Sequence, residues 1–188
     1  MPVIPSREGE RDAVLQVAKL MLASARTAPK SGGVDDILSA IVLEEEKDSL
    51  VAEMERLAQE RGSSSFTRDA GNVRDSEAVV LIGVRGTKSF GLNCGACGYS
   101  GCQEFDEAER KSGIDFTGPT CLFKGLDLGI ALGSAVKTAS LLNVDSRIMY
   151  RIGTAARKLG MLPEASTIMG IPLSVEGKNI YFDRSEQK

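Results

Sequence analysis

The chain has 188 residues, 42% of them hydrophobic and 26% charged, which is ordinary for a globular protein with one substantial core. The net charge of −3, with scattered acids and bases, and the absence of tryptophan argue against nucleic acid or a membrane surface as partner. No apolar run approaches the roughly 20 residues that span a bilayer, and the first residues lack a secretory signal pattern, so we expect a cytoplasmic protein.

The first half of the chain alternates helical and strand patterns. Helical spacing of apolar residues predicts a helix over 10–28, ended by Pro29 and the Gly32–Gly33 pair. A β-branched run predicts a strand over 37–44, and a charged segment with one apolar stripe predicts a surface helix over 45–62. The polar segment 63–76 has room for a short helix. The apolar run over 77–86 is typical of a strand buried on both faces.

The second half begins with a long segment, 87–120, that has little periodicity; loops of this length are usually functional. A helix that is apolar nearly all round is predicted over 121–142 and should be buried. Another helix is predicted over 147–160, capped by Asp145 or Ser146, and strands over 166–175 and 178–184. We interpret residues 1–188 as one α/β (α+β) domain, a central sheet flanked by helices, with an insertion at about 87–121.

The four cysteines of the chain have the spacing C-x2-C-x4-C-x18-C, and the chain contains no histidine. A cubane iron–sulfur cluster has four iron corners, each of which takes one thiolate. One glycine-rich loop can wrap three corners, with Gly91, Gly95, Gly98 and Gly101 allowing sharp turns, while the fourth ligand comes from elsewhere in the fold. We therefore predict a [4Fe-4S] cluster, with these ligands: Cys94, Cys97, Cys102 and Cys121.

Three other interpretations of the cysteines stay open. A structural zinc site also uses four thiolates, although it typically arranges them as two short-spaced pairs. Cys94 and Cys97 could form a redox-active thiol pair, which leaves Cys102 and Cys121 unexplained. The third interpretation is four unrelated buried cysteines, and their clustering argues against it.

The stretch "CGACGYSGCQEF" (94–105) resembles the [4Fe-4S] module of electron-transfer complex subunits and corrinoid iron–sulfur proteins. In that module CGxCGxxxC is followed by a distant cysteine, which implies the same four ligands. Over most of its length the chain resembles a family of uncharacterised prokaryotic proteins described as containing a ferredoxin domain. The stretches that carry this resemblance are 25–37, 90–102, 126–160 and 170–184.

The stretch "SARTAPKSGG" (24–33) is similar to the early helix and loop of flavin-dependent nitroreductases, in which A-x-x-A-P-S leads to an asparagine that contacts FMN. This resemblance implies a nitroreductase-like fold, a homodimer and FMN as a second cofactor, with Arg26, Lys30 and Ser31 as candidate phosphate contacts. Here the asparagine position is occupied by the Gly32-Gly33-Val34 stretch. Without flavin, the three candidates are simply a helix end and a turn.

We expect the protein to carry one [4Fe-4S] cluster and to transfer single electrons to a redox partner protein or to a second cofactor. One alternative is a non-enzymatic binding or sensing module in which the cluster, or a zinc ion, is structural. The other is an FMN-dependent nitroreductase-like oxidoreductase. The sequence assigns no catalytic residue.

Overall fold

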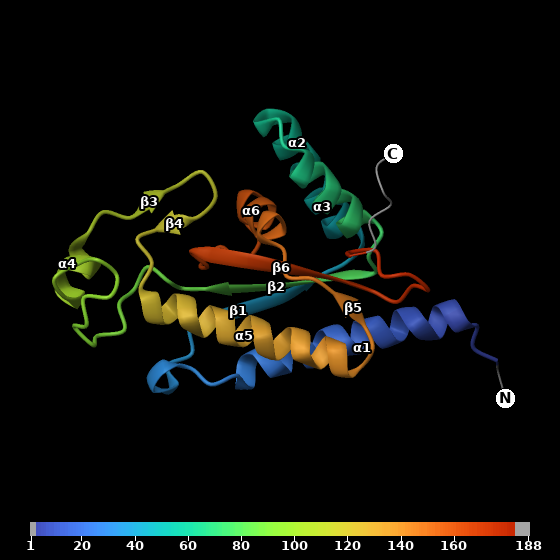
Figure 1. Ribbon diagram of the computed structural model, residues 1–188, viewed down its shortest axis with the longest axis horizontal. Coiled ribbons are helices and arrows are strands. Elements are labelled where there is room, and N and C mark those ends of the chain that lie inside the picture. The colour runs from blue at the N-terminus through green and yellow to red at the C-terminus, as the bar shows by residue number, and fades with distance from the viewer. Residues whose placement is uncertain (1–2, 183–188) are drawn as a thin grey trace.

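A four-stranded antiparallel sheet in the order β1–β2–β6–β5 forms the centre of the fold (Figure 1). This computed structural model describes residues 3–182. The sheet consists of β1 (Ile37–Val42), β2 (Ala78–Val84), β5 (Asp145–Ser146) and β6 (Thr167–Ser174). The helices are α1 (Ser6–Thr27), α2 (Glu44–Arg61), α3 (Ser64–Arg74), α4 (Cys102–Glu107), α5 (Leu122–Leu141) and α6 (Tyr150–Lys158), together with the 3₁₀ turn η1 (Ser31–Gly33). A small hairpin pairs β3 (Lys111–Ser112) with β4 (Thr117–Gly118).

Strand β2 is buried on both faces, as its apolar run predicts. Successive side chains of a strand point to opposite faces, so the run supplies two separate cores. Val80 and Ile82 pack with α1 and α5, whereas Val79 and Leu81 pack with α2, α3 and α6. The sheet therefore lies between two helical layers.

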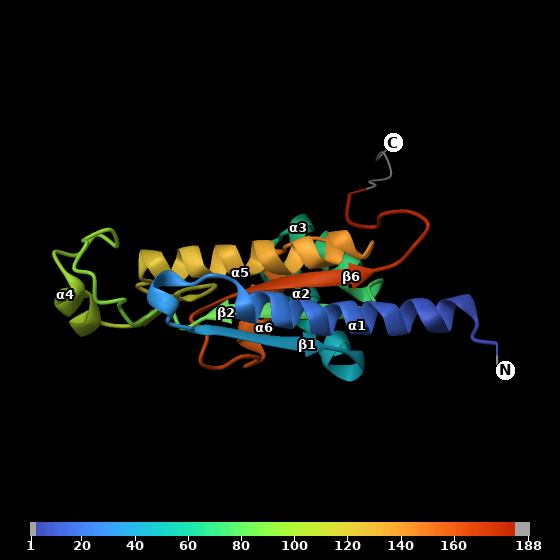
Figure 2. The ribbon, with the colours of Figure 1, turned by 90° about the horizontal axis from the view of Figure 1, so that it is seen from below.

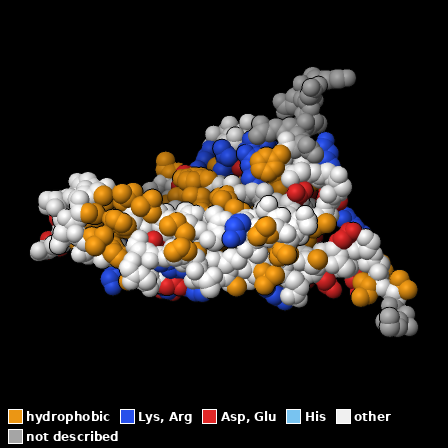
Figure 3. Space-filling view, turned by 60° about the horizontal axis from the view of Figure 1, so that its bottom comes forward, with side chains coloured by type: hydrophobic (Ala, Val, Ile, Leu, Met, Phe, Trp, Pro, Cys, Tyr) orange, Lys and Arg blue, Asp and Glu red, His pale blue; other side chains and the backbone are white. Residues whose placement is uncertain are grey.

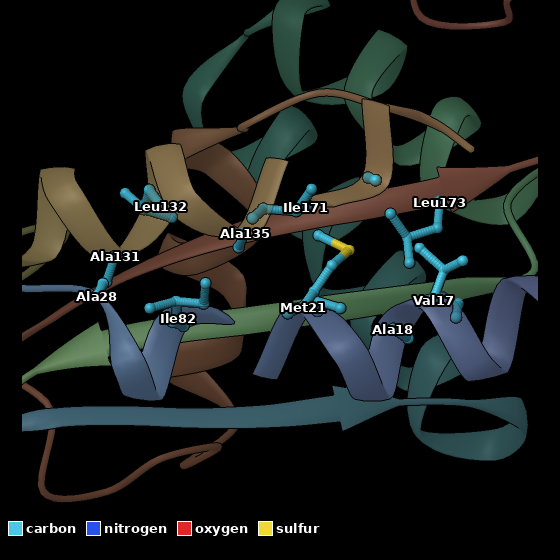
Figure 4. Close-up of a cluster of buried hydrophobic side chains, with 14 of the residues drawn as sticks. Val17, Ala18, Met21, Ala28, Ile82, Ala131, Leu132, Ala135, Ile171 and Leu173 are labelled. Carbon is cyan, nitrogen blue, oxygen red and sulfur yellow. The ribbon is translucent and has the colours of Figure 1, made fainter. Parts of the chain in front are cut away.

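Helices α1 and α5 lie side by side in opposite directions over one face of the sheet (Figure 2). Figure 4 shows Met21 of α1 and Ala135 of α5 directed toward Ile171 of β6, and all three are fully buried. Burying a side chain the size of Met21 or Ile171 contributes about 1.5–3 kcal/mol. The small residues on the inner side of α5 let α1 approach closely, and the Oγ atoms of Ser24 and Thr138 are 2.6 Å apart across the pair.

On the other face, α6 lies directly against the backbone of β6. A Cβ atom on Gly153 would stand 1.7 Å from the carbonyl oxygen of Ile168, and one on Gly170 would stand 2.0 Å from Ile152 Cγ2. Both positions therefore require glycine. The buried carboxylate of Asp69 on α3 accepts a 3.0 Å hydrogen bond from Arg151 Nη1, which ties α3 to α6.

The predicted helix over 121–142 is α5, but the expectation that it is buried all round was wrong. Leu122, Leu126 and Ile130 are 46%, 51% and 44% exposed. The sheet and α1 cover the inner side of this helix, and within residues 3–182 no element covers the outer side. No helix in this described range combines the length and apolar character needed to cross a bilayer.

Two further local expectations were wrong. Asp145 and Ser146 pair with β6 as strand β5, and the N-cap of α6 is Met149. Residues 178–182 form turns instead of a strand. There the Oδ1 atom of Asn179 accepts hydrogen bonds from the backbone N–H groups two and three residues further on, at 3.0 and 3.2 Å, which removes donors that a strand would use. Residues 183–184 of that predicted strand lie outside the described residues.

Candidate metal centre

The segment between β2 and α5 extends beyond one end of the sheet and carries the first three cysteines (Figure 1). Its two ends are held together, because the backbone N–H of Cys121 donates to the carbonyl oxygen of Gly86 at 2.9 Å. The N–H of Gly86 in turn donates to Ser166 Oγ at 2.9 Å. These bonds fix Cys121 near the point where the segment leaves β2.

The four cysteines line one hollow, which has about 10 Å³ of room for the centre of a water-sized sphere, enough for about one water molecule, and about 310 Å³ of empty space when the part open to solvent is counted. Cys121 is buried, Cys97 and Cys102 are half-buried, and Cys94 is exposed; all four are free thiols. The structure therefore brings together the four residues that the sequence singles out. Within residues 3–182, no three cysteine or carboxylate side chains are grouped closely enough to hold a single metal ion.

The backbone of the cysteine segment turns where the sequence places glycine. Gly95 and Gly98 have φ angles of +67° and +88°, which other residues adopt only with strain. Gly101 is different, because its φ of −168° is ordinary extended backbone. The small size of Gly101 matters because a Cβ atom there would lie 3.2 Å from Asn93 Oδ1, closer than an ordinary contact.

Two carboxylates of α4 fasten the segment from the outside. Glu104 Oε2 accepts hydrogen bonds from the hydroxyl and the N–H of Ser100, at 2.6 and 2.8 Å. Asp106 accepts the hydroxyl and the N–H of Ser89, at 2.6 and 2.9 Å. In each case the serine hydroxyl, followed by the N–H, lowers the pKa of the carboxyl group. Both carboxylates are therefore charged acceptors at neutral pH.

Cys121 is the N-cap residue of α5, which confirms the expectation that it stands at a helix start. The positive end of the helix dipole favours a thiolate or another anion at this position. Two aromatic rings, those of Phe90 and Phe123, line the hollow beside it with their centroids 5.8 Å apart. Phe90, Phe123 and Asn93 belong to the site, and sequence reasoning did not single them out.

The three candidate phosphate contacts are engaged within the fold. Lys30 is nearly buried, and its ammonium donates to three carbonyl oxygens near the end of α1 at 2.6–3.1 Å. A lysine has three donors, so none is left over. Arg26 pairs with Asp35, and Ser31 donates its N–H and hydroxyl to Asp127 Oδ1 at 2.9 and 2.8 Å. These residues form a helix end and a turn, in which Lys30 and Ser31 are fully engaged, whereas the side chain of Arg26 is 56% exposed and uses only its Nη1 group.

The segment that resembles the nitroreductase loop lies against the cysteine segment. A Cβ on Gly32 would stand 2.6 Å from Cζ of Phe90, so the ring packs directly on the backbone of η1. Gly32 also has a φ of +55°. The two segments that the sequence singled out separately, 24–33 and 90–102, are thus neighbours in the fold.

A protein-family model described as "Uncharacterized protein containing a ferredoxin domain" matches residues 117–184. This part of the chain contains Cys121 and follows the other three cysteines. A protein of Archaeoglobus fulgidus, described only as uncharacterised, is 50% identical over 186 residues, which are 99% of this chain and 100% of the relative.

Among solved structures, the chain is similar to nitroreductases. Nitroreductase CinD from Lactococcus lactis, in complex with nicotinic acid, aligns with a TM-score of 0.58 and 13% identity over 87% of this chain and 79% of that chain. A protein of Desulfovibrio desulfuricans described as a nitroreductase in complex with FMN aligns with a TM-score of 0.54 and 13% identity over 92% and 80%. At such low identity the similarity establishes a nitroreductase-like fold.

Proposed function

The chain belongs to the family of uncharacterised proteins that contain a ferredoxin domain, and we propose that it is a one-electron carrier holding a single [4Fe-4S] cluster. The observation that carries this proposal is the common hollow lined by Cys94, Cys97, Cys102 and Cys121. Four thiols that come from two separate segments and line one hollow suit a group that takes four thiolate ligands. The ferredoxin-domain description of the family supports an iron–sulfur role.

The residues around the hollow fit such a group. Four thiolates satisfy the four irons of a cubane, and the bound group supplies reversible one-electron chemistry. The backbone N–H of Asn93 donates to Cys102 Sγ at 3.2 Å, the kind of amide–sulfur bond that raises a cluster's potential. Phe90 and Phe123 limit the access of water on the inner side.

A redox titration tests the electron-transfer role. Anaerobically purified protein is titrated with dithionite and a mediator mixture while its visible absorbance is recorded. The proposal expects a reversible one-electron transition within the span of about −700 to +450 mV covered by iron–sulfur proteins. A cluster that bleaches irreversibly, or that takes up no electron, would support the structural or sensing role instead.

The two alternative functions require other cofactors, a zinc ion or FMN. A zinc ion bound by the four cysteines would be colourless and would give no such transition. The nitroreductase-like fold favours FMN as a second cofactor, as in the Desulfovibrio desulfuricans protein. Because Lys30 and Ser31 are engaged elsewhere, a flavin phosphate would need contacts from other residues besides Arg26.

The exposed side of the hollow is where we propose that a redox partner docks. Cys94 is exposed, and Leu92 and Leu122, which also line the hollow, are 52% and 46% exposed. Figure 3 shows hydrophobic side chains gathered toward this end of the molecule. A small apolar rim suits the brief contacts of electron-transfer proteins, whose interfaces bury less than about 1,200 Å².

We further propose that the protein is a homodimer formed through the outer face of α5. Leu122, Leu126 and Ile130 form a ridge along this face at intervals of four residues, and all are exposed. A parallel row of glycines, at positions 125, 129 and 133, forms a groove in which an added Cβ would meet nothing within 4 Å. Each copy presents both ridge and groove, so two copies related by a twofold axis complement one another.

A further inference from the structure

A buried ion pair lies just behind the cysteine site. Lys124, three residues after Cys121, is only 1% exposed, and its Nζ atom donates a 2.5 Å hydrogen bond to Asp36 Oδ2. The same ammonium stands 5.2 Å from the centroid of the Phe90 ring. Phe90 lines the hollow formed by the four cysteines. The ring therefore lies against both the ammonium and the hollow.

The position of Lys124 is electrostatically unfavourable in isolation. It occupies the first turn of α5, where the helix dipole is positive and disfavours a cation. Removing the ammonium from water adds a further cost, and a buried ion pair often stabilises a fold no better than apolar side chains would. Asp36 supplies one negative charge, and its side chain is 20% exposed. A second anion close to the ammonium would account for a buried cation at this end of the helix.

We infer that Lys124 and Asp36 set the reduction potential of the cluster in opposite directions; this inference rests on the proposed function. The cluster gains one electron on reduction and becomes more negative. The ammonium favours that state and raises the potential, and the carboxylate opposes it and lowers the potential. Neither residue touches the cysteines through any hydrogen bond in the described residues, so both are positioning charges that act through a poorly screened interior.

The test is a redox titration of four variants with the cluster bound. Lys124→Met removes the ammonium and should lower the potential, whereas Asp36→Asn removes the carboxylate and should raise it. For each of these two variants, we expect the ratio of oxidised to reduced protein at a fixed potential to change at least roughly threefold. This change corresponds to a shift of about 28 mV in the reduction potential, at 59 mV per tenfold. Lys124→Arg keeps the charge and should remain close to the unaltered protein. Lys137→Met is the matched control, because it removes an exposed lysine of α5 about 20 Å further along the helix.

Opposite shifts for Lys124→Met and Asp36→Asn, with no shift for Lys137→Met, would support the inference. Variants that bind the cluster but have unchanged reduction potentials would overturn the inference and leave the proposed function intact. A protein without any iron–sulfur cluster would overturn both. If Lys124→Met does not assemble the cluster, Asp36→Asn decides the matter. Asp36 is partly exposed, and among residues 3–182 its side chain accepts a hydrogen bond only from Lys124, so it tolerates the change more readily.

Discussion

Asn93 and Cys102 are joined by two reciprocal hydrogen bonds. The N–H of Asn93 donates to Cys102 Sγ at 3.2 Å, and the N–H of Cys102 donates to Asn93 Oδ1 at 2.9 Å. Asn93 adopts a φ of +51°, a conformation that asparagine tolerates better than most residues. Asn93 thus binds the sulfur of a predicted ligand through its backbone N–H and caps the N–H of that ligand with its side chain.

The first prediction concerns this pair. Asn93→Ala should make the loaded protein lose iron to a chelator several-fold faster, because one lost hydrogen bond is worth about 1 kcal/mol, or roughly fivefold. Asn93→Asp keeps the acceptor oxygen and should lose iron at nearly the original rate. Asn93→Gly relieves the backbone but lacks the acceptor, so it should resemble Asn93→Ala. Equal rates in all four proteins would show that the side-chain bond contributes nothing.

The second prediction tests the packing of α6 on β6. Gly153→Ala should lower the free energy of unfolding by about 3 kcal/mol, the upper range for overpacking, because the methyl group would meet the backbone of Ile168. Gly71→Ala is the matched control in an open part of α3 and should raise stability by up to about 1 kcal/mol. Urea unfolding followed by circular dichroism measures both. A stable Gly153→Ala protein would contradict the close contact.

These contacts show where sequence reasoning succeeds and where it ends. Apolar periodicity placed α1, α2, β2 and α5 correctly, because each has a face or a run that must be buried. The spacing of the cysteines singled out four residues that line one hollow in the structure, and their role as cluster ligands stays a prediction. The importance of Asn93, Phe90 and Lys124 could not be predicted, since it depends on which segments meet in space. The outer face of α5 was misjudged because apolar character alone does not say which partner covers it.

The third prediction concerns pH. Burial raises the pKa of Asp115, but hydrogen bonds from Arg61 at 2.6 Å and from Tyr150 at 2.9 Å outweigh it and hold that pKa below its usual value. A carboxyl with a depressed folded pKa stabilises the fold above its unfolded pKa of about 3.9 and loses that contribution as pH falls through the folded value. Asp115→Asn should therefore cost up to about 1 kcal/mol at pH 7 and progressively less below pH 4. Urea unfolding of both proteins at several pH values measures this difference, and a difference that does not vary with pH would contradict the assignment.

The fourth prediction tests the proposed dimer. Leu126→Glu should be monomeric at concentrations at which the unaltered chain is dimeric, because the new carboxylate would be buried without a partner. Gly129→Leu fills the groove and should have the same effect while preserving the helix. Gln59→Glu, which adds the same charge on exposed α2 across the sheet, should leave the dimer intact. Light scattering coupled to size exclusion gives the masses; a monomeric unaltered chain would refute the proposal.

The most direct test of the cluster is the content of iron and acid-labile sulfide in anaerobically purified protein. We expect about four irons and four sulfides per chain, with a broad visible absorbance that dithionite bleaches. Replacing Cys94, Cys97, Cys102 or Cys121 by alanine should remove most of both, whereas Gln103→Ala, at an exposed position next to Cys102, should retain them. One zinc per chain without sulfide, or normal iron in the Cys102→Ala variant, would contradict the account.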